Sequence, residues 1–315
     1  MQVIVAGCGA LGSVCAAGLI RGGVEVQVYQ RHGATLDALR QQGGVKIVES
    51  DGQAPELIPV TRISDKAEEL ELADLIIVLV KAYSTEELKP LGSRLREHGV
   101  VLTLQNGLGN AEVLAEIFGD NRVAAGVATY GAFRLSPGTV QAAGSGLITL
   151  GPWKAADEMG GMQWVADTLR SAGFSADYVS DPRPYIWRKL AINAMVNTTA
   201  ALTRAKNGLL RQDDQILGLM RRLGEETVEA AHRAGVRVDF DDLWKFHMEN
   251  LQKTGSNRAS MLQDVEAKRL TEIDAISGTV LRYAQNGNEF PYTRAVYSLI
   301  KGIDAIQLSL SSTCK

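Results

Sequence analysis

The sequence predicts an α/β Rossmann-type N-terminal domain with a parallel-rich sheet, followed by an all-α C-terminal domain. In the first half, short runs of β-branched residues alternate with helical stretches, as they do in βαβ units. A glycine-rich loop stands between the first such run and the first helix. In SDPRPYIW (180–187) two prolines break the pattern, and only helical periodicity follows. We therefore expect one domain over residues 1–180 and a second over residues 181–315.

The strand-like runs lie within the first 150 residues. ADLIIVLV (73–80) is continuously apolar, which is typical of a strand covered on both faces. Residues 123–150 contain further strands around a Pro-Gly turn at Pro137–Gly138. The earlier elements are a strand in MQVIVAG (1–7), a helix over 10–22, and strands in VEVQVY (24–29) and VVLTLQ (100–105).

The second domain is expected to consist of helices joined by short loops. GSNRAS (255–260) is polar and indicates one such loop. Long apolar helices are suited to a homodimer interface, although the sequence does not show which face would be used. The predicted helices cover 187–204, 213–234, 241–253, 261–286 and 293–309.

The composition is that of a globular protein with a slight negative charge. Of 315 residues, 45% are apolar and 22% are charged, and the net charge is −3 with a pI near 5.9. This balance argues against binding to nucleic acid or to a membrane surface. There is no apolar run of about 18 residues or more that would cross a membrane, and we expect a cytoplasmic protein. Cys8, Cys15 and Cys314 form no CxxC and the four histidines are scattered, so we expect neither a disulfide framework nor a metal site.

The sequence GCGALG fits the dinucleotide-binding pattern GxGxxG. The bare pattern is weak, but here it follows a strand directly and opens a helix. Glycines in this position allow the backbone to approach a pyrophosphate, and the helix N-terminus supplies free N–H groups. A glycine-rich turn without a ligand is the alternative. The loop residues are Gly7, Cys8, Gly9, Ala10, Leu11 and Gly12.

The end of the second strand indicates which dinucleotide is bound. An NAD site would place an acidic residue about 20 residues beyond the loop, where it bonds the ribose 2′-OH. This chain has Tyr29-Gln30-Arg31-His32 there, without an acid. The Arg31 guanidinium suits a 2′-phosphate, which favours NADPH/NADP+ over NADH. A surface arginine with no ligand is the alternative.

Two further strands end in polar residues. LIIVLV runs into Lys81, and VVLTLQ runs into Asn106-Gly107. Ligands of open parallel sheets bind outside the carboxyl ends of the strands, so Lys81 and Asn106 are placed to face a cofactor or a substrate. Plain loop residues are the alternative, and Asn-Gly is also a common turn signal.

The apolar helix WRKLAINAMVN (187–197) carries three polar residues at four-residue spacing. Lys189, Asn193 and Asn197 therefore fall on one narrow stripe. A simply amphipathic helix would have a wider and more charged polar face. A buried ammonium and buried amides need partners, and a small oxygen-rich substrate would supply them. Hydrogen bonds to neighbouring helices are the structural alternative.

A second polar cluster lies in SMLQDVEAKRLTE (260–272). Ser260 is expected to cap a helix, with Gln263 completing a capping box. Asp264, Lys268 and Glu272 follow at four-residue spacing. On the pattern alone a solvated stripe of salt bridges is favoured, and nothing in the spacing singles out Glu272.

Over nearly its full length the chain resembles the ketopantoate reductase (2-dehydropantoate 2-reductase) family, with two domains in the same order. Each motif alone is unspecific, whereas the set is specific. The resemblance rests on GCGALG (7–12), Lys81, QNGLG (105–109), WRKLAINAMVN (187–197), Asn207-Gly208 and SMLQDVEAKRLTEID (260–274).

The resemblance implies a role for each motif. The lysine of the KLxxNxxxN helix is the family's general acid, which points to Lys189. Glu272 corresponds to a catalytic residue near both the cofactor and the active site. Lys81 and Asn106 correspond to cofactor and substrate contacts, and Ala132 in TYGAF to a backbone contact with the cofactor. The implied substrate contacts are Asn106, Asn193, Asn197, Asn207 and Ser260, the last at the carboxylate end of the substrate.

The reaction expected from these features is the reduction of 2-dehydropantoate (ketopantoate) to pantoate, as in pantothenate biosynthesis, with NADPH as hydride donor. A lysine suits the acid because burial can lower its pKa toward the working pH, whereas arginine keeps its proton. Two alternatives stay open. One is an NADPH-dependent reductase that has the same fold and catalytic residues but acts on another branched 2-oxo acid. The other is a non-catalytic NADP(H)-binding regulator. A regulator needs no general acid, so the polar stripe of Lys189, Asn193 and Asn197 argues against the regulator.

Overall fold

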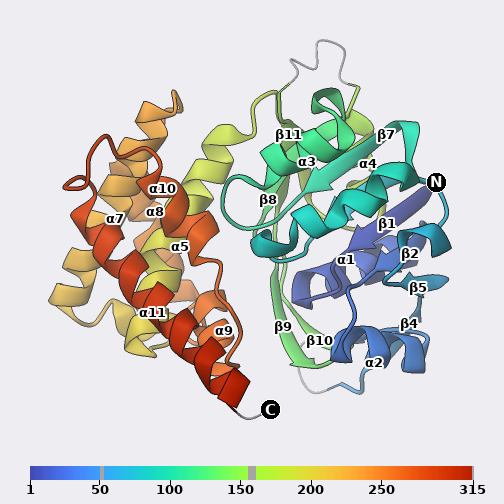
Figure 1. The fold of residues 1–315 in the computed structure, drawn as a ribbon, viewed down its shortest axis with the longest axis horizontal. Coiled ribbons are helices and arrows are strands. Elements are labelled where there is room, and N and C mark those ends of the chain that lie inside the picture. The colour runs from blue at the N-terminus through green and yellow to red at the C-terminus, as the bar shows by residue number, and fades with distance from the viewer. Residues whose placement is uncertain (50–52, 155–160, 314–315) are drawn as a thin grey trace. The chain divides into compact units, whose positions relative to one another are not determined.

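The computed structural model describes residues 1–49, 53–154 and 161–313 (Figure 1). Two compact units make up the chain. The first contains Met1–Gln105 and Asn110–Pro182, and the second contains Asn106–Gly109 and Arg183–Lys315. The short segment 106–109 thus belongs to the helical unit although it follows a strand of the first. Cys314 lies outside the described residues.

The first unit contains an eight-stranded sheet of order β12-β11-β8-β7-β6-β1-β2-β5. All neighbouring pairs in it are parallel except β8 and β11. The parallel-rich α/β sheet predicted from the sequence is therefore confirmed. Its strands are β1 (Gln2–Ala6), β2 (Glu25–Tyr29), β5 (Arg62–Ser64), β6 (Ala73–Val78), β7 (Leu95–Thr103), β8 (Val123–Ala128), β11 (Ile148–Pro152) and β12 (Ala176–Tyr178).

A second sheet of four strands, β4-β3-β10-β9, was not foreseen. Its strands are β3 (Gly44–Val48), β4 (Glu56–Pro59), β9 (Gly131–Ser136) and β10 (Thr139–Ala143). Pro137–Gly138 makes the predicted turn between β9 and β10, and Gly138 has a φ of +72° that favours glycine. The strands predicted within 123–150 are therefore divided between two sheets, because β8 and β11 pair with each other in the large one.

The first unit also contains the helices and turns that connect its strands. Strands β6 and β7 are joined by 3-10 turns, η2 (Ala82–Ser84) and η3 (Glu86–Arg94), the latter with Pro90 inside. Proline lacks the N–H that an α-helix needs at an interior position, which accounts for this irregular connection. The remaining elements are α1 (Ala10–Arg21), α2 (Ala34–Gln42), α3 (Asn110–Phe118), α4 (Gln163–Ser171), η1 (Ala67–Glu69) and η4 (Asp120–Arg122).

The described residues of the second unit form helices and loops, which confirms the predicted all-α region. Leucine, alanine and methionine side chains of α5 and α7 form much of its buried core. The elements are α5 (Arg183–Thr203), α6 (Asn207–Leu210), α7 (Asp214–Arg233), α8 (Phe240–Lys253), α9 (Ser260–Glu266), the π-helix η5 (Asp274–Gly278), α10 (Thr279–Leu281) and α11 (Pro291–Thr313).

The predicted continuous helix over 261–286 is wrong. Helix α9 ends at Glu266, and Lys268 adopts a φ of +53°, which an α-helix excludes. The break is held by Arg269, whose backbone N–H donates to the Asp264 carbonyl at 2.8 Å and whose side chain pairs with the Asp264 carboxylate at 3.0 Å. Apolar periodicity continues across the break, so the pattern alone could not reveal it.

Two further predictions for residues 260–272, the solvated charge stripe and the capping box, are also wrong. The solvated charge stripe is wrong, because Asp264 and Glu272 are only 3% and 6% exposed. The capping box is also wrong. Ala259 holds the N-cap position of α9 without a side-chain bond, and the Gln263 amide instead donates to the Arg258 carbonyl at 2.9 Å.

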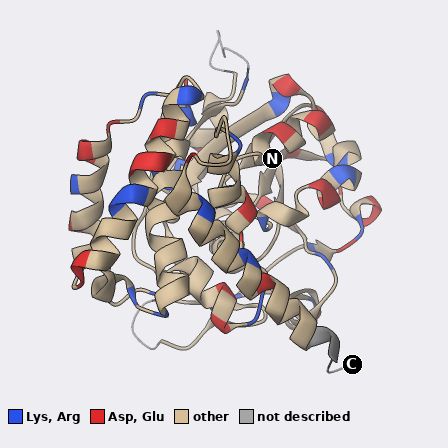
Figure 2. Cartoon of the chain, turned by 60° about the vertical axis from the view of Figure 1, so that its left-hand side comes forward, with Lys and Arg blue, Asp and Glu red and all other residues tan. Residues whose placement is uncertain are grey.

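Charged side chains of both signs are interspersed along the same helices (Figure 2). An electrostatic site for nucleic acid would instead gather lysine and arginine on one face. Among the described residues, no helix is long and apolar enough to cross a membrane.

Candidate active site

Two glycines of the GCGALG loop are required by packing. Gly7 has a φ of +97°, and a Cβ there would lie 2.6 Å from the Val80 nitrogen. A Cβ on Gly12 would lie 1.9 Å from the Gly7 carbonyl oxygen. Both distances are far below van der Waals contact, so the tight turn between β1 and α1 can be built only from glycine at these positions.

Gly9 differs, because a Cβ there would meet nothing within 4 Å. It is the N-cap of α1 and makes no side-chain cap bond, so the first-turn N–H groups of Ala10 and Leu11 have no intrahelical acceptor. Open space beside a helix N-terminus is what a dinucleotide pyrophosphate needs. The residues present therefore fit this cofactor group.

Cys8 contributes its backbone to the loop. Its N–H donates to the Gln30 side-chain oxygen at 2.8 Å, which ties the loop to the end of β2. Burial raises the pKa of the Cys8 thiol to about 12, partly offset by a hydrogen bond with Ser13. The thiol is thus protonated at neutral pH and is a packing group.

Arg31 lies two residues beyond the end of β2 and is exposed. Its Nη1 donates to the Ser84 hydroxyl at 3.2 Å, and this hydroxyl donates to the Glu87 carboxylate at 3.2 Å. Ser84 lies three residues beyond Lys81, so the connection after β6 supports the arginine at the end of β2. Sequence analysis did not identify Ser84, because its role depends on a contact across 53 positions.

The ends of β6 and β7 are joined by a buried side chain that sequence analysis missed, Gln105. Its amide nitrogen donates to the Val80 carbonyl at 3.0 Å and to the Thr85 hydroxyl at 2.9 Å, and its oxygen accepts from Thr103 at 3.0 Å. Gln105 therefore fixes the backbone on both sides of half-buried Lys81. The sequence signal that could have identified Gln105 is its position as the polar last residue of the apolar strand VVLTLQ.

Lys81 and Asn106 are in different units, although both follow strands. The segment 106–109 packs on η5: the Leu108 N–H donates to the Ala275 carbonyl at 3.0 Å, and a Cβ on Gly107 would lie 2.3 Å from that oxygen. This contact presents the Asn106 amide, whose nitrogen donates to the Glu272 carboxylate at 3.4 Å.

The polar stripe lies on helix α5. Asn197 is buried, and its amide nitrogen donates to the Ser260 hydroxyl at 3.2 Å. Lys189 is partly buried, and burial lowers its pKa from 10.5 to about 8 against the opposing negative charge of Glu272. Segments far apart in sequence thus bring Asn106, Glu272 and Lys189 into one electrostatic cluster in the helical unit.

Two other residues suggested by the resemblance carry unsatisfied buried atoms. Asn193 Nδ2 and Asn207 Oδ1 are buried without a hydrogen-bond partner among the described residues. Asn207 is held in place by its backbone, whose N–H donates to the Asn257 carbonyl at 3.0 Å. Buried polar atoms without partners are costly in free energy, and a bound ligand would satisfy them. One atom is a donor and the other an acceptor.

Ala132 lies in β9, opposite Ala142 of β10. Strand β9 packs against α1, the helix that begins at the glycine loop. Only a backbone contact was suggested for this residue, and its alanine side chain adds no polar group to the site.

Among the described residues, no group of three or more His, Cys, Asp or Glu side chains could hold a metal ion. His247 is buried in α8, and burial lowers its pKa to about 4. It is therefore neutral at physiological pH.

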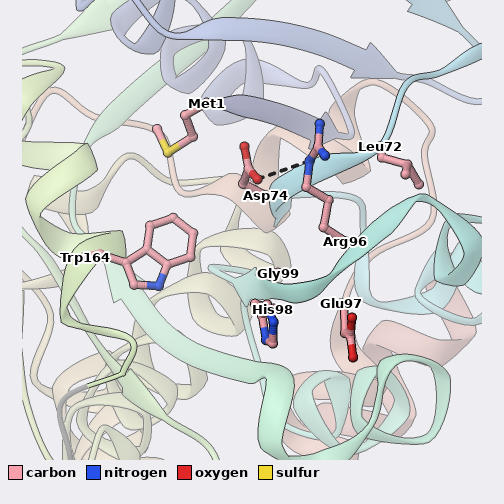
Figure 3. Close-up of a pocket in the computed structure, with 8 residues that line it drawn as sticks. All are labelled: Met1, Leu72, Asp74, Arg96, Glu97, His98, Gly99 and Trp164. Atoms are coloured by element: carbon pink, nitrogen blue, oxygen red, sulfur yellow. Dashed lines mark ion pairs between the residues drawn. The ribbon is translucent and has the colours of Figure 1, made fainter.

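A hollow of about 630 Å³ opens on the first unit (Figure 3). Residues there stand at the starts of β1, β6 and β7, whereas Gly7 and Lys81 follow strand ends. An ion pair of Asp74 and Arg96 at 3.2 Å crosses it, with both side chains well exposed. Ligands of such sheets bind at the opposite edge, so this hollow is not the predicted cofactor site. It is lined by Met1, Leu72, Asp74, Arg96, Glu97, His98, Gly99 and Trp164.

A glycine loop shaped for a pyrophosphate, together with a lysine whose pKa lies near neutrality, is characteristic of a dinucleotide-dependent oxidoreductase. A family model described as "Ketopantoate reductase PanE/ApbA" matches residues 3–155, and one described as "Ketopantoate reductase PanE/ApbA C terminal" matches residues 181–304. The chain therefore belongs to the ketopantoate reductase family.

Individual relatives agree over the whole length. The 2-dehydropantoate 2-reductase of Halobacterium salinarum is 31% identical, covering 96% of this chain and 98% of the relative. That of Escherichia coli O157:H7 is 30% identical, covering 96% and 94%.

Solved structures show the same fold. The 2-dehydropantoate 2-reductase from Geobacter metallireducens superposes with a TM-score of 0.85 at 30% identity, covering 96% of this chain and 99% of the other. D-mandelate dehydrogenase with NADH and anilino(oxo)acetate gives a TM-score of 0.89 at 23% identity, covering 98% and 99%. At that lower identity the likeness concerns the fold alone.

Proposed function

We propose that the protein reduces 2-dehydropantoate to pantoate with NADPH. The observation that carries this proposal is Lys189, a partly buried lysine on a stripe of amides with its pKa lowered to about 8. At neutral pH such a lysine is mostly protonated, yet it gives up its proton far more readily than an exposed one. Those are the properties of a general acid.

The residues of the first unit would hold the cofactor. The open side of Gly9 and the N-terminus of α1 suit the pyrophosphate, and Arg31 suits the 2′-phosphate. Lys81 and the backbone of Ala132 are further proposed contacts from this unit, and the family resemblance adds Asn106 and Glu272 as cofactor contacts. When bound, NADPH supplies the hydride that the 2-oxo carbon accepts.

Lys189 would protonate the substrate oxygen. As the carbonyl carbon gains a hydride, negative charge develops on its oxygen, and a nearby ammonium stabilises that charge most in the transition state. Proton transfer from Nζ completes the hydroxyl and leaves a neutral amine. Glu272 supports this step because its carboxylate raises the pKa of Lys189 and so keeps the amine protonated before reaction. The Asn106 amide orients that carboxylate.

The unpaired atoms favour a hydroxylated substrate. Asn193 Nδ2 is a donor and would bond a substrate oxygen, whereas Asn207 Oδ1 is an acceptor and needs a donor. 2-Dehydropantoate has a terminal hydroxyl that can donate to Asn207. Branched 2-oxo acids without a hydroxyl would leave Asn207 Oδ1 buried and unpaired. Asn197 and Ser260, which already bond each other, would hold the carboxylate end.

A substrate panel tests this assignment. We expect kcat/KM for 2-dehydropantoate to exceed that for 2-oxoisovalerate by about 10²-fold or more, because a site built to bond a hydroxyl rejects the analogue that lacks it. Asn207→Ala should reduce this ratio mainly by weakening turnover of 2-dehydropantoate. Absorbance of NADPH gives both rates. Equal kcat/KM values would favour the other-substrate alternative, and absence of NADPH oxidation with every 2-oxo acid would favour the regulator.

A second prediction concerns the 2′-phosphate. Arg31→Ala should raise the Kd of NADPH about 10- to 100-fold and leave that of NADH within about twofold, because only NADPH loses a charge-assisted hydrogen bond. Fluorescence titration of the reduced nicotinamide measures both constants. Arg21→Ala, at an exposed arginine on α1, is the matched control. Equal weakening of the two cofactors would refute the role of Arg31.

We also propose a homodimer through the helical unit and a cytoplasmic location. Helix α11 exposes Leu299, Ile306 and Leu310 at spacings of seven and four residues, with exposed fractions of 58%, 62% and 58%. These side chains share one face, and a second copy of the chain would remove it from water. Buried free thiols at Cys8 and Cys15 suit a reducing compartment.

A further inference from the structure

The loop that carries Glu272 is held in place from helix α11. The Thr271 N–H donates to Asp304 Oδ1 at 3.2 Å, and the Thr271 hydroxyl donates to Asp304 Oδ2 at 2.8 Å. Both residues are buried, at 4% and 5% exposure. One carboxylate thus takes both donors of the residue that immediately precedes Glu272.

The hydroxyl of Thr271 also reaches past Glu272. It accepts the N–H of Ile273 at 3.4 Å, while the Glu272 carbonyl accepts the N–H groups of Ala275 and Ile276 at 3.1 Å each. The backbone of Glu272 is therefore bonded on both sides. Because Asp304 fixes the rotamer of Thr271, it fixes the start of the π-helix as well.

Asp304 is a buried carboxylate, and its presence at this position needs a reason. Burial raises the pKa of Asp304, and the two bonds from Thr271 oppose that change. Isolated buried charges cost free energy, and an apolar pair of similar volume often serves stability as well or better. Packing alone would therefore not require an aspartate here.

We propose that Asp304 is a positioning residue for the reaction: through Thr271 it places the Glu272 carboxylate against Lys189 and the Asn106 amide. This inference rests on the proposed function, in which Glu272 keeps Lys189 protonated. Asp304 itself acts only through Thr271.

Three variants test the chain of contacts from Asp304 to Lys189. Asp304→Leu removes the carboxylate that accepts both bonds from Thr271, and Thr271→Val removes the hydroxyl that donates one of them. Thr271→Ser retains the hydroxyl. We expect the first two to lower kcat about tenfold with little change in the Kd of NADPH. They should also move the alkaline limb of the kcat/KM profile to lower pH, because a displaced Glu272 supports the protonated lysine less. The double variant Asp304→Leu/Thr271→Val should have a kcat no lower than that of the more impaired single variant. Thr271→Ser should have the kcat and the pH profile of the wild type.

Leu308→Ala is the control on the same helix. Leu308 is 55% exposed, and its truncation should leave the pH profile in place. Glu272→Gln separates the possible failures. If Glu272→Gln moves the alkaline limb while Thr271→Val and Asp304→Leu do not, the positioning role is overturned. If Glu272→Gln itself leaves the limb in place, the role proposed for Glu272 fails, and the positioning role fails with it. Should Asp304→Leu not fold, Thr271→Val still decides the question.

Discussion

Lys189→Met is expected to lower kcat for 2-dehydropantoate by about 10³-fold or more, because it removes both the proton donor and the charge that stabilises the developing oxyanion. Methionine retains most of the side-chain volume, so the helix α5 core should remain packed. The Kd of NADPH should stay within about threefold of wild type, since the proposed cofactor contacts lie mainly in the first unit. Stopped-flow measurement of NADPH oxidation, with a separate cofactor titration, provides the two numbers.

Stability provides the control for this variant. Burial lowers the pKa of Lys189, which means that the ammonium is less favourable in the folded protein than in the unfolded chain. Replacing it with an apolar side chain should therefore leave Tm unchanged or raise it. A variant with normal Tm and normal turnover would exclude Lys189 as the acid.

The pH dependence of the two reaction directions should be opposite. Reduction needs protonated Lys189, so kcat/KM should fall about tenfold per pH unit above the pKa of about 8. Oxidation of pantoate needs the neutral amine as a base, so its kcat/KM should rise with pH below about 8 and then level off. Initial rates across this pH range in both directions provide the profiles.

The loss of reduction at high pH can be separated from unfolding. The pKa of Lys189 is about 8 in the folded protein, whereas a lysine in the unfolded chain has its ordinary pKa of 10.5. Between these values the unfolded chain binds more protons, so this group makes the folded state more stable as the pH rises. Activity and this contribution to stability thus change in opposite directions. Parallel profiles for reduction and oxidation would contradict the assignment of Lys189.

Features that depend on local spacing could be predicted from the sequence. The glycine loop lies between a strand and a helix as expected, and Lys189, Asn193 and Asn197 share one stripe because all three lie within the single helix α5. The parallel-rich sheet also follows from short apolar runs separated by helices. In each case neighbouring residues contain the whole signal.

Features that depend on distant contacts could not be predicted in this way. Asn106 and Glu272 are 166 positions apart, and their contact depends on segment 106–109 packing against the π-helix η5 within the helical unit. The break after α9 depends on buried Asp264 pairing with Arg269, whereas the charge pattern indicated a solvated stripe. Only the family resemblance drew attention to Glu272 and Asn207.

The comparison of Lys189→Arg with Lys189→Met tests the central claim most directly. Arginine retains the positive charge but does not release its proton in a protein. If Lys189 is the proton donor, kcat of Lys189→Arg at neutral pH should remain within about tenfold of Lys189→Met and far below wild type. Recovery of most of the wild-type turnover by Lys189→Arg would contradict this, because it would show that the site needs a cation and takes its proton from elsewhere.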